Sequence, residues 1–341
     1  MPGHALIVNE EGGIEIAQIL PAKERKACSF ERIYFSRGSD EKIYRERNAL
    51  GYHLSEPVLN AVDYDLKNTI FSFIPNTAET AFFGMVKGME DYLNKVKVER
   101  ILSWDKDFDE EKLTEMINRR IRIEKIAIKD VKMRTFITED VSRNEMVQHV
   151  YDITYGTVRP GKDTLVVIDD SIVRGTTLRE SIIRMLARLK PKRIIVVSSS
   201  PQIRYPDCYG IDMSKMGDFI AFNAVVALMK ERGKSKCMNE LLERCEELQR
   251  DNQLHSENVV KQLYNQFTAE EISAKIAQLV TPPGLTIPVD VIFQRIEDLH
   301  KACPGNLGDW YFTGNYPTPG GNRVVNKAFM NYMEGKNVRG Y

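Results

Sequence analysis

Leu165-Val-Val-Ile-Asp169-Asp170-Ser171-Ile-Val-Arg174-Gly175-Thr176-Thr177 is the most informative stretch of this chain. Its first half is an unbroken aliphatic run, which is typical of a strand covered on both faces in a parallel sheet. Two carboxylates follow at the carboxyl end of that strand. In open α/β sheets this end lines a crevice in which ligands bind, so the stretch predicts a doubly wound α/β fold and the place of its site.

A helix is predicted directly after this stretch. Its apolar face comprises Leu178, Ile182, Met185, Leu186 and Leu189. Thr177 and Glu180 have the spacing of a capping box. Unpaired N–H groups at a helix start carry partial positive charge, and small residues let an anion approach them closely. We therefore expect the Gly175-Thr176-Thr177 turn to hold a phosphate monoester.

Asp169 and Asp170 would repel that phosphate if they faced it. We expect them instead to accept hydrogen bonds from sugar hydroxyls or to hold a magnesium ion. An acid pair followed by a phosphate cradle therefore indicates a phosphorylated sugar. The alternative is that Asp-Asp only ends a strand and the hydroxyl residues only cap a helix, but the ordered arrangement of so many matching residues argues against it.

Length and composition describe a globular protein of about two domains. Of the 341 residues, 43% are hydrophobic and 28% are charged, and 48 Lys and Arg balance 48 Asp and Glu. This balance gives no net field that would attract nucleic acid or an anionic membrane, which argues against a DNA-binding repressor. Because we find neither a membrane-spanning apolar run nor a secretory leader, a cytoplasmic location is expected. The scattered cysteines are expected to be reduced thiols.

The other strands and helices are predicted from their hydrophobic patterns. Ala5-Leu-Ile-Val and Ile14-Glu-Ile-Ala-Gln-Ile flank a Glu-Gly-Gly turn and predict a β-hairpin. Residues 68–75 predict a parallel strand, followed by a polar turn at Thr77 and a helix over 81–95. Three further elements are predicted: a buried strand over 193–201, a helix over 218–229 and a helical insertion over 230–285. Right-handed crossovers would place helices on both faces of the sheet.

The helical insertion is rich in Lys, Glu and Gln. A coiled-coil partner surface is one alternative for it. The helical repeat is too short to favour that alternative over a solvated helical hairpin.

Four motifs resemble one known family. The segment from Val167 to Thr177 resembles the phosphoribosyl pyrophosphate (PRPP) signature of type I phosphoribosyltransferases, in the form found in the glutamine PRPP amidotransferases. Three further stretches resemble motifs of that family, in the same order: Phe30-Glu-Arg-Ile-Tyr34-Phe35-Ser-Arg37, Ile203-Arg204-Tyr-Pro206-Asp-Cys-Tyr209-Gly210-Ile211-Asp212 and Phe312-Thr313-Gly314-Asn-Tyr316-Pro317-Thr318. These motifs span most of the chain, so the resemblance is specific, and it implies the type I phosphoribosyltransferase fold.

The resemblance also implies a division of the chain. Residues 1–55 would be a hairpin and linker that follow a glutaminase domain, and residues 56–229 with 286–341 would form the phosphoribosyltransferase domain. The family's glutaminase nucleophile is an N-terminal cysteine, whose free α-amino group acts as base. Here the chain begins Met1-Pro2, and the first cysteine, Cys28, is internal. We expect a synthase domain cut at its natural boundary, or alternatively a stand-alone protein that takes ammonia from elsewhere.

The resemblance implies a role for each site residue. Asp169 and Asp170 would bind the ribose and, together with Thr77, Mg²⁺. Arg134 and Arg174 would be the catalytic residues that hold the departing pyrophosphate. The PRPP site would be completed by Ser171, Ile172, Val173, Gly175, Thr176 and Thr177.

Two stretches depart from the family pattern. Asn76 and Ala78 replace an acid and a second hydroxyl, so a water-bridged metal contact and an ordinary helix N-cap are both open at Thr77. In the family a mobile basic loop closes over the site, and here Arg134-Thr135-Phe136 match it, whereas His149-Val-Tyr151-Asp152 does not. A solvated charged hairpin is the alternative for that loop. Arg204, Tyr209 and Asp212 would either support the site or touch the ligand.

Some family members carry an iron–sulfur cluster, which needs four convergent cysteines. Cys28 and Cys208 stand at or near the first two ligand positions, but Gly308 and Tyr311 replace the Cys-x-x-Cys pair, and Cys303 lies upstream. We expect no cluster, and buried thiols at Cys28 and Cys208.

The function that the resemblance implies is formation of 5-phosphoribosylamine from PRPP and ammonia, with Mg²⁺ as cofactor, in a homo-oligomer. This is the first step of purine synthesis. Because loss of pyrophosphate builds positive charge at C1 and ammonia is already a nucleophile, the reaction needs charge stabilisation rather than a strong base. Two alternatives stay open: a non-catalytic module that senses PRPP or a purine nucleotide, and a phosphoribosyltransferase that uses a base.

Overall fold

A five-stranded parallel sheet forms the centre of the molecule. The computed structural model describes residues 3–22, 24–104, 109–129, 151–210, 213–336 and 338–340. The sheet has the order β4-β3-β7-β8-β9, and every neighbouring pair is parallel. Its strands are β3 (Thr69–Phe73), β4 (Arg122–Ile123), β7 (Thr164–Asp169), β8 (Arg193–Ser198) and β9 (Val289–Phe293). The strand that ends in the acid pair is therefore the middle one, as its aliphatic composition predicted.

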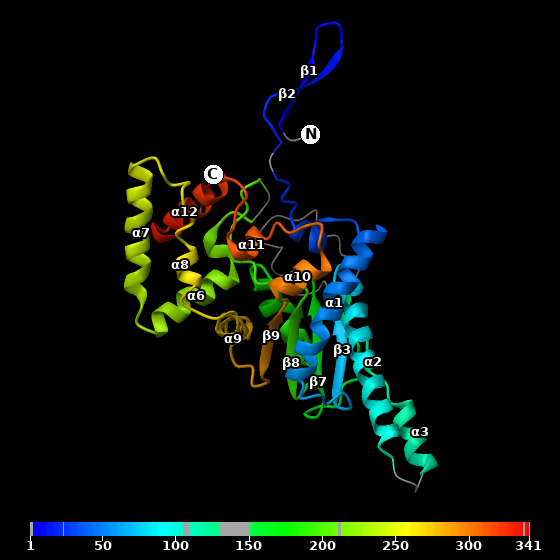
Figure 1. The fold of residues 1–341 in the computed structure, drawn as a ribbon. Coiled ribbons are helices and arrows are strands. Elements are labelled where there is room, and N and C mark those ends of the chain that lie inside the picture. The colour runs from blue at the N-terminus through cyan, green and yellow to red at the C-terminus, as the bar shows by residue number, and fades with distance from the viewer. Residues whose placement is uncertain are drawn as a thin grey trace.

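Helices cover both faces of this sheet (Figure 1). Val166 and Ile168 of β7 belong to an apolar cluster with helices α1 and α2, whereas Leu165 and Val167 point the other way, into a cluster with α5, α6 and α9. These helices are α1 (Glu41–Ala61), α2 (Glu79–Leu102), α5 (Ile183–Ala187), α6 (Ile220–Glu231) and α9 (Ala269–Val280). The predicted doubly wound arrangement is confirmed.

Helix α1 is absent from the sequence prediction, which places no helix before residue 81. The Asp40 side chain caps it by accepting from the N–H of Ile43 at 3.0 Å. Buried residues recur at helical spacing along it, so the signal was present: Ile43, Leu50, Leu54 and Val58. A domain boundary at residue 55 would cut this continuous helix.

Helices α1 and α2 touch through glycines. A Cβ atom added to Gly51 would lie 1.7 Å from the carbonyl oxygen of Ala81, and one added to Gly84 would lie 1.9 Å from that of Asn48. Backbone therefore packs directly on backbone, and neither helix can accept a side chain at the crossing. This contact fixes α1 against the start of α2, which follows the β3 loop of the candidate site.

We expect Gly51→Ala to lower the free energy of unfolding by about 2–3 kcal/mol, because overpacking forces the two backbones apart. Urea unfolding monitored by circular dichroism measures this loss. Gly320→Ala in helix α12 (Pro319–Met333) is the matched control, since its Cβ would meet no atom closer than 4.0 Å, from Thr318 Oγ1. It should be neutral or slightly stabilising. Equal unfolding energies for Gly51→Ala and the wild type would contradict the tight crossing.

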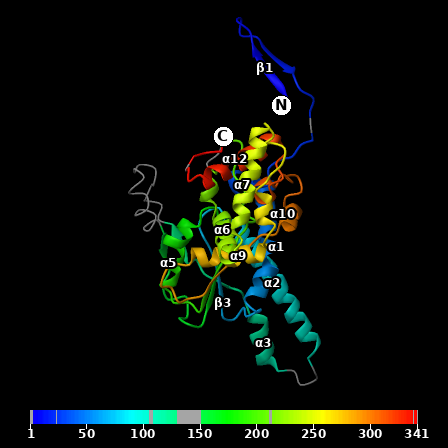
Figure 2. The ribbon, with the colours of Figure 1, turned by 90° about the vertical axis from the view of Figure 1, so that its left-hand side faces the viewer.

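The predicted N-terminal hairpin is present. β1 (His4–Val8) and β2 (Ile14–Gln18) pair antiparallel, and Gly12 in the turn has a φ of +80°. The hairpin projects away from the rest of the chain (Figures 1 and 2).

Residues 230–285 are helical, as predicted. They contain α7 (Ser235–Arg250), α8 (Lys261–Tyr264) and α9, and α7 contacts both α6 and the C-terminal helix α12 (Pro319–Met333). Helix α9 packs on α6 and β9 and contributes buried residues to the core of the sheet. The chain is completed by a π-helical turn (Glu31–Phe35), α3 (Glu110–Asn118), a π-helical turn (Leu178–Ile182), a 3₁₀ turn (Met216–Asp218), α10 (Ile296–Ala302) and α11 (Trp310–Thr313).

A small antiparallel pair, β5 (Ala127–Lys129) with β6 (Tyr151–Ile153), precedes β7 in the chain. Arg134 and the rest of the predicted closing loop lie between these strands, in residues 130–150, outside the described residues.

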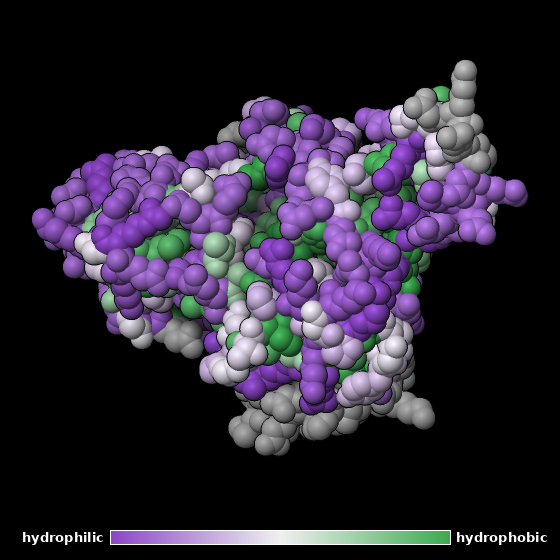
Figure 3. Space-filling view, turned by 90° about the horizontal axis from the view of Figure 1, so that it is seen from below, coloured by the Kyte–Doolittle hydropathy of each residue, from purple (hydrophilic) through white to green (hydrophobic). Residues whose placement is uncertain are grey.

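Polar side chains cover most of the face seen from below, and apolar residues gather near its middle (Figure 3). Within the described part of the chain, every helix is too short or too polar to cross a membrane.

Candidate functional site

Three loops meet at the carboxyl edge of the sheet, after β3, β7 and β8. The N–H of Ile74 donates to the carbonyl of Ile168 at 2.9 Å, and the N–H of Ser199 donates to the carbonyl of Asp169 at 2.9 Å. The Ser199 hydroxyl also donates to the backbone carbonyl of Asp170, at 3.1 Å. These bonds hold the three loops around the acid pair.

Both aspartates of the pair are held by hydrogen bonds. Asp169 Oδ1 accepts from the N–H of Asp170 at 2.8 Å, and Asp170 Oδ1 accepts from the Ser171 hydroxyl at 2.7 Å. The Thr77 hydroxyl, from the β3 loop, also donates to the Asp170 carboxylate. Burial raises the pKa of both carboxyls, and the negative charge of Asp170 raises the pKa of Asp169 further. A bound cation would offset this repulsion and favour the ionised pair.

The donor set suits magnesium. The structure brings Thr77 to Asp170, and Asp170 is beside Asp169, so the three residues predicted as metal ligands are close together. In the described ranges no group of three or more His, Cys, Asp or Glu could hold a metal ion on its own. Mg²⁺ in enzymes often takes one or two carboxylates and completes its shell with water and ligand phosphates. Two aspartates and a hydroxyl therefore fit Mg²⁺ that arrives with a phosphorylated ligand.

The predicted phosphate cradle is open to solvent. Gly175 has a φ of +71°, and a Cβ there would lie 3.0 Å from the Val280 side chain, so glycine is required in this turn. Thr176 and Thr177 are exposed. A cavity of about 230 Å³ opens here, lined by Arg174, Gly175, Thr176, Arg179, Gly217, Asp218, Ile220, Asn223 and Leu279. The loop is anchored behind it, where Ile172 is buried and the carbonyl of Val173 accepts from the N–H of Ile220 at 2.8 Å.

The predicted capping box is wrong. Thr177 has helical backbone angles, with φ −58° and ψ −39°, and makes no capping hydrogen bond through its side chain. Glu180 pairs instead with Arg179 at 2.7 Å and with Arg184 at 3.4 Å. The reason is that the helix already begins at Thr176, so Thr177 lies inside its first turn. The Thr177 hydroxyl is thereby left for a ligand rather than used as a cap.

Known proteins similar to this chain are amidophosphoribosyltransferases. The enzyme of Pseudomonas aeruginosa is 30% identical over 228 residues, which cover 65% of this chain and 39% of the relative. That of Bacillus subtilis is 30% identical over 227 residues, which cover 64% and 39%, and that of Lachancea kluyveri is 27% identical over 254 residues, which cover 71% and 43%. This chain is similar to part of the amidophosphoribosyltransferases. It spans about two fifths of the length of the curated relatives it matches, and no protein-family model matches it.

Solved amidophosphoribosyltransferase structures share the fold. The B. subtilis glutamine PRPP amidotransferase, solved in complex with ADP and GMP, aligns with a TM-score of 0.52 at 24% identity, over 93% of this chain and 52% of that one. A structure described as the allosteric regulatory enzyme of purine biosynthesis aligns with a TM-score of 0.53 at 24% identity, over 93% and 51%. The predicted fold class is confirmed.

Arg174 lies on the cradle side of the site. It lines the cavity beside Gly175 and Thr176 and pairs with Asp218 at 3.2 Å. A pyrophosphate on Mg²⁺ is expected beside Asp170 and Thr77. These two residues do not line that cavity. A pyrophosphate contact from Arg174 therefore stays a prediction, and so does the one from Arg134, which lies outside the described residues.

Some amidophosphoribosyltransferases carry an iron–sulfur cluster, and the residues at its ligand positions lie near one another in this structure. The backbones of Cys28 and Gly308 form a β-bridge, and the Tyr311 hydroxyl donates to Asp207 at 2.6 Å, beside Cys208. Both thiols are half-buried, less than predicted, because each lies in a loop rather than in the core. Burial raises the pKa of each thiol to about 11, which keeps both protonated at neutral pH.

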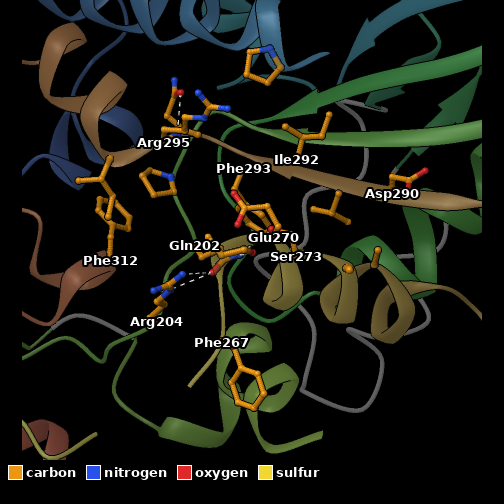
Figure 4. A pocket seen from close by; sticks show the side chains of 18 of the residues that line it. Gln202, Arg204, Phe267, Glu270, Ser273, Asp290, Ile292, Phe293, Arg295 and Phe312 are labelled. Atoms are coloured by element: carbon orange, nitrogen blue, oxygen red, sulfur yellow. Dashed lines mark hydrogen bonds between the residues drawn. The ribbon is translucent and has the colours of Figure 1, made fainter. Parts of the chain in front are cut away.

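A further cavity lies along the edge strand β9 and helix α9, and neither aspartate of the acid pair lines it (Figure 4). It encloses about 920 Å³. Arg204, one of the motif residues, points into it and donates to Gln202 Oε1 at 2.7 and 3.0 Å, while Gln202 donates to Ser273 of α9 at 2.8 Å. Gln202 thus ties the β8 loop to α9, and Arg204 holds Gln202 within that loop. A ligand contact from Arg204 stays a prediction.

Sequence reasoning missed Arg47, whose positive charge attracts the Asp170 carboxylate. It lies on α1, the helix that was also missed. The helical spacing of the buried residues of α1 would have identified the helix, but no local pattern connects Arg47 to an acid on β7.

Proposed function

We propose that this chain is the phosphoribosyl-transfer part of an amidophosphoribosyltransferase, and that it forms 5-phosphoribosylamine and pyrophosphate from PRPP and ammonia. The observation that carries the proposal is the pairing, on one loop at the carboxyl edge of the sheet, of two aspartates with an open glycine–threonine turn. PRPP carries ribose hydroxyls, a pyrophosphate and a 5′-phosphate, and this loop offers carboxylates for the hydroxyls and an open turn for the 5′-phosphate. The names of the curated relatives support the same reaction.

In the proposed complex, Asp169 and Asp170 accept hydrogen bonds from the ribose hydroxyls, and the exposed turn at Thr176 and Thr177 receives the 5′-phosphate. The lone pair of ammonia forms the new bond to C1 as the bond from C1 to the pyrophosphate oxygen breaks. The electron pair of the broken C1–O bond leaves with pyrophosphate, and the ammonium group formed at C1 releases a proton to solvent. The carboxylates of Asp169 and Asp170 stabilise the positive charge that builds on the ribose. Arg134 and Arg174 stabilise the leaving group.

Magnesium is part of this proposal. Asp169, Asp170 and the Thr77 hydroxyl would hold it, directly or through water, and it would supply positive charge to the pyrophosphate oxygens.

The domain limits also belong to the proposal. We assign residues 56–229 and 286–341 to the phosphoribosyltransferase domain and residues 230–285 to a helical insertion, and we add α1 because it packs on α2 through glycine contacts. The partner that supplies ammonia would be a glutaminase domain of the intact protein. A homo-oligomer and a cytoplasmic location complete this proposal.

Pyrophosphate release with PRPP, Mg²⁺ and either ammonium or glutamine tests the proposed reaction. We expect turnover with ammonium and none with glutamine, because Cys28 lacks the α-amino group that a terminal cysteine nucleophile uses as base. An enzyme-coupled pyrophosphate assay on the purified chain measures both rates. Equal rates with glutamine would contradict the proposal that this chain uses ammonia alone.

PRPP binding without turnover under either condition would favour the alternative, a non-catalytic sensor of PRPP. The enzymatic names of the curated relatives support the catalytic proposal over that alternative.

A further inference from the structure

Arg47 is a buried arginine close to the candidate site, with 6% of its surface exposed. Its Nε donates to the carbonyl of Arg32 at 3.0 Å, and its Nη2 donates to the carbonyls of Ser36 at 2.8 Å and Tyr34 at 3.4 Å. A planar guanidinium presents its donors in a fixed fork, so it can hold several acceptors in one geometry. Here the fork holds a stretch of backbone rather than a carboxylate.

That backbone is the π-helical turn Glu31–Phe35 and the residue after it. The turn is anchored on its other side by Phe30, whose ring is buried with only 2% exposed. Glu46, the acid next to Arg47 in the chain, forms an ion pair with Arg32 at 2.5 Å. The turn is therefore fixed to α1 at two points, by the Arg47 fork and by the pair of Arg32 with Glu46.

The positive charge of Arg47 also acts on the loop after β7. Arg47 and Asp170 attract one another electrostatically. The same carboxylate accepts hydrogen bonds from Ser171, on its own loop, and from Thr77, on the β3 loop. Asp170 is thus the point at which α1, the β3 loop and the β7 loop converge.

The position of Arg47 relative to these loops is fixed by the glycine crossing of α1 with α2. Asn48, the next residue along α1, has its carbonyl against Gly84, and Gly51 lies against Ala81. Gln294 also donates to the carbonyl of Leu50 at 2.7 Å, which ties α1 to the end of β9. Because the α1 backbone is held at Asn48, Leu50 and Gly51, directly after Arg47, the cation is held in a preorganised place.

We propose that Arg47 is a positioning residue, which holds the turn Glu31–Phe35 against α1 and places a positive charge near the Asp170 carboxylate, in the arrangement that PRPP binding requires. This inference rests on the proposed function. Arg47 does not touch the reacting atoms in it, and acts through Asp170 and through the turn.

The test compares Arg47→Gln, Arg47→Lys and Arg45→Gln. Calorimetry with PRPP in Mg²⁺ measures affinity, and the ammonium-dependent assay gives KM and kcat. For Arg47→Gln we expect the Kd and the KM for PRPP to rise about 10–100-fold, as is typical when a residue that orients a ligand-binding group is lost. The kcat should stay within about twofold, because interactions lost equally from ground and transition states raise KM alone.

Arg47→Lys keeps the charge but loses the fork, so we expect a loss of affinity that is smaller than that of Arg47→Gln. Arg45→Gln is the matched control. Arg45 lies on the same helix, its side chain is 76% exposed, and it pairs with Glu41 within one turn. It should bind PRPP as the wild type does.

Wild-type affinity in both folded Arg47 variants would overturn this inference and leave the proposed function intact. If Arg47→Gln does not fold, Arg47→Lys decides, and wild-type affinity in it overturns the inference. A variant that lowers only the amount of folded protein reduces the apparent kcat with KM unchanged, and that result overturns it too. Failure of the wild type to bind PRPP would contradict the proposed function and this inference together.

Discussion

Asp170→Asn is expected to weaken PRPP binding by about 10–100-fold in the presence of Mg²⁺. The substitution keeps the shape of the side chain but removes the charge, and a hydrogen bond to a charged group contributes about 1.5–3 kcal/mol. Asp169→Asn should also weaken PRPP binding. Isothermal titration calorimetry of PRPP into each variant measures the loss.

The stability of these two variants should not fall. Because burial raises the pKa of both carboxyls, folding disfavours their ionised forms. Removing either charge should leave the unfolding free energy unchanged or increase it, which separates a binding defect from a folding defect. Asp91→Asn, at an exposed position on α2, is the control and should change neither property. Unchanged PRPP affinity in both site variants would remove the sugar-binding role of the pair.

Asp163→Asn is expected to lower the free energy of unfolding by about 3–5 kcal/mol, because it breaks a buried ion pair from one side. The Asp163 side chain is fully buried at the start of β7, 2.7 Å from Arg122 Nη1 and 2.5 Å from Arg159 Nη2. Arg122 is on β4 and Arg159 precedes β7, so the Asp163 carboxylate links β4 to the segment that leads into β7. Urea unfolding at neutral pH measures the loss.

The pH dependence of this loss has a defined sign. The two arginines hold the pKa of Asp163 well below its usual range, against the effect of burial. The group therefore stabilises the fold above the unfolded pKa of about 3.8, and this stabilisation is lost as the pH falls through the lower folded pKa. The difference between wild type and Asp163→Asn should be constant near neutrality and shrink below about pH 4.

Asp290→Asn provides the matched control for Asp163→Asn. Asp290, on β9, pairs with Arg193 at 2.5 Å, but its side chain is 42% exposed. Breaking a solvated pair should cost less than about 1 kcal/mol. Similar losses for Asp163→Asn and Asp290→Asn would show that burial does not set the strength of the first pair.

Local patterns predicted the parts of this protein whose causes are local. β7 was predicted because a strand buried on both faces needs a continuous aliphatic run, and the hairpin of β1 and β2 because alternating apolar residues flank a glycine turn. The edge strand β9 was not predicted. Its segment Val289-Asp-Val-Ile-Phe293 carries a charged residue, which a strand tolerates at the side of a sheet but which breaks the pattern of a buried one.

The sequence by itself determined the order of acid pair and phosphate turn along one loop, because both belong to a single strand–turn–helix unit whose geometry is local. Only the tertiary structure decided which distant residues meet that loop. Thr77 reaches Asp170 through the pairing of β3 with β7, and the charge of Arg47 acts on the same acid because glycines let α1 touch α2. Such contacts depend on how helices and strands pack, and packing leaves no fixed spacing in the chain.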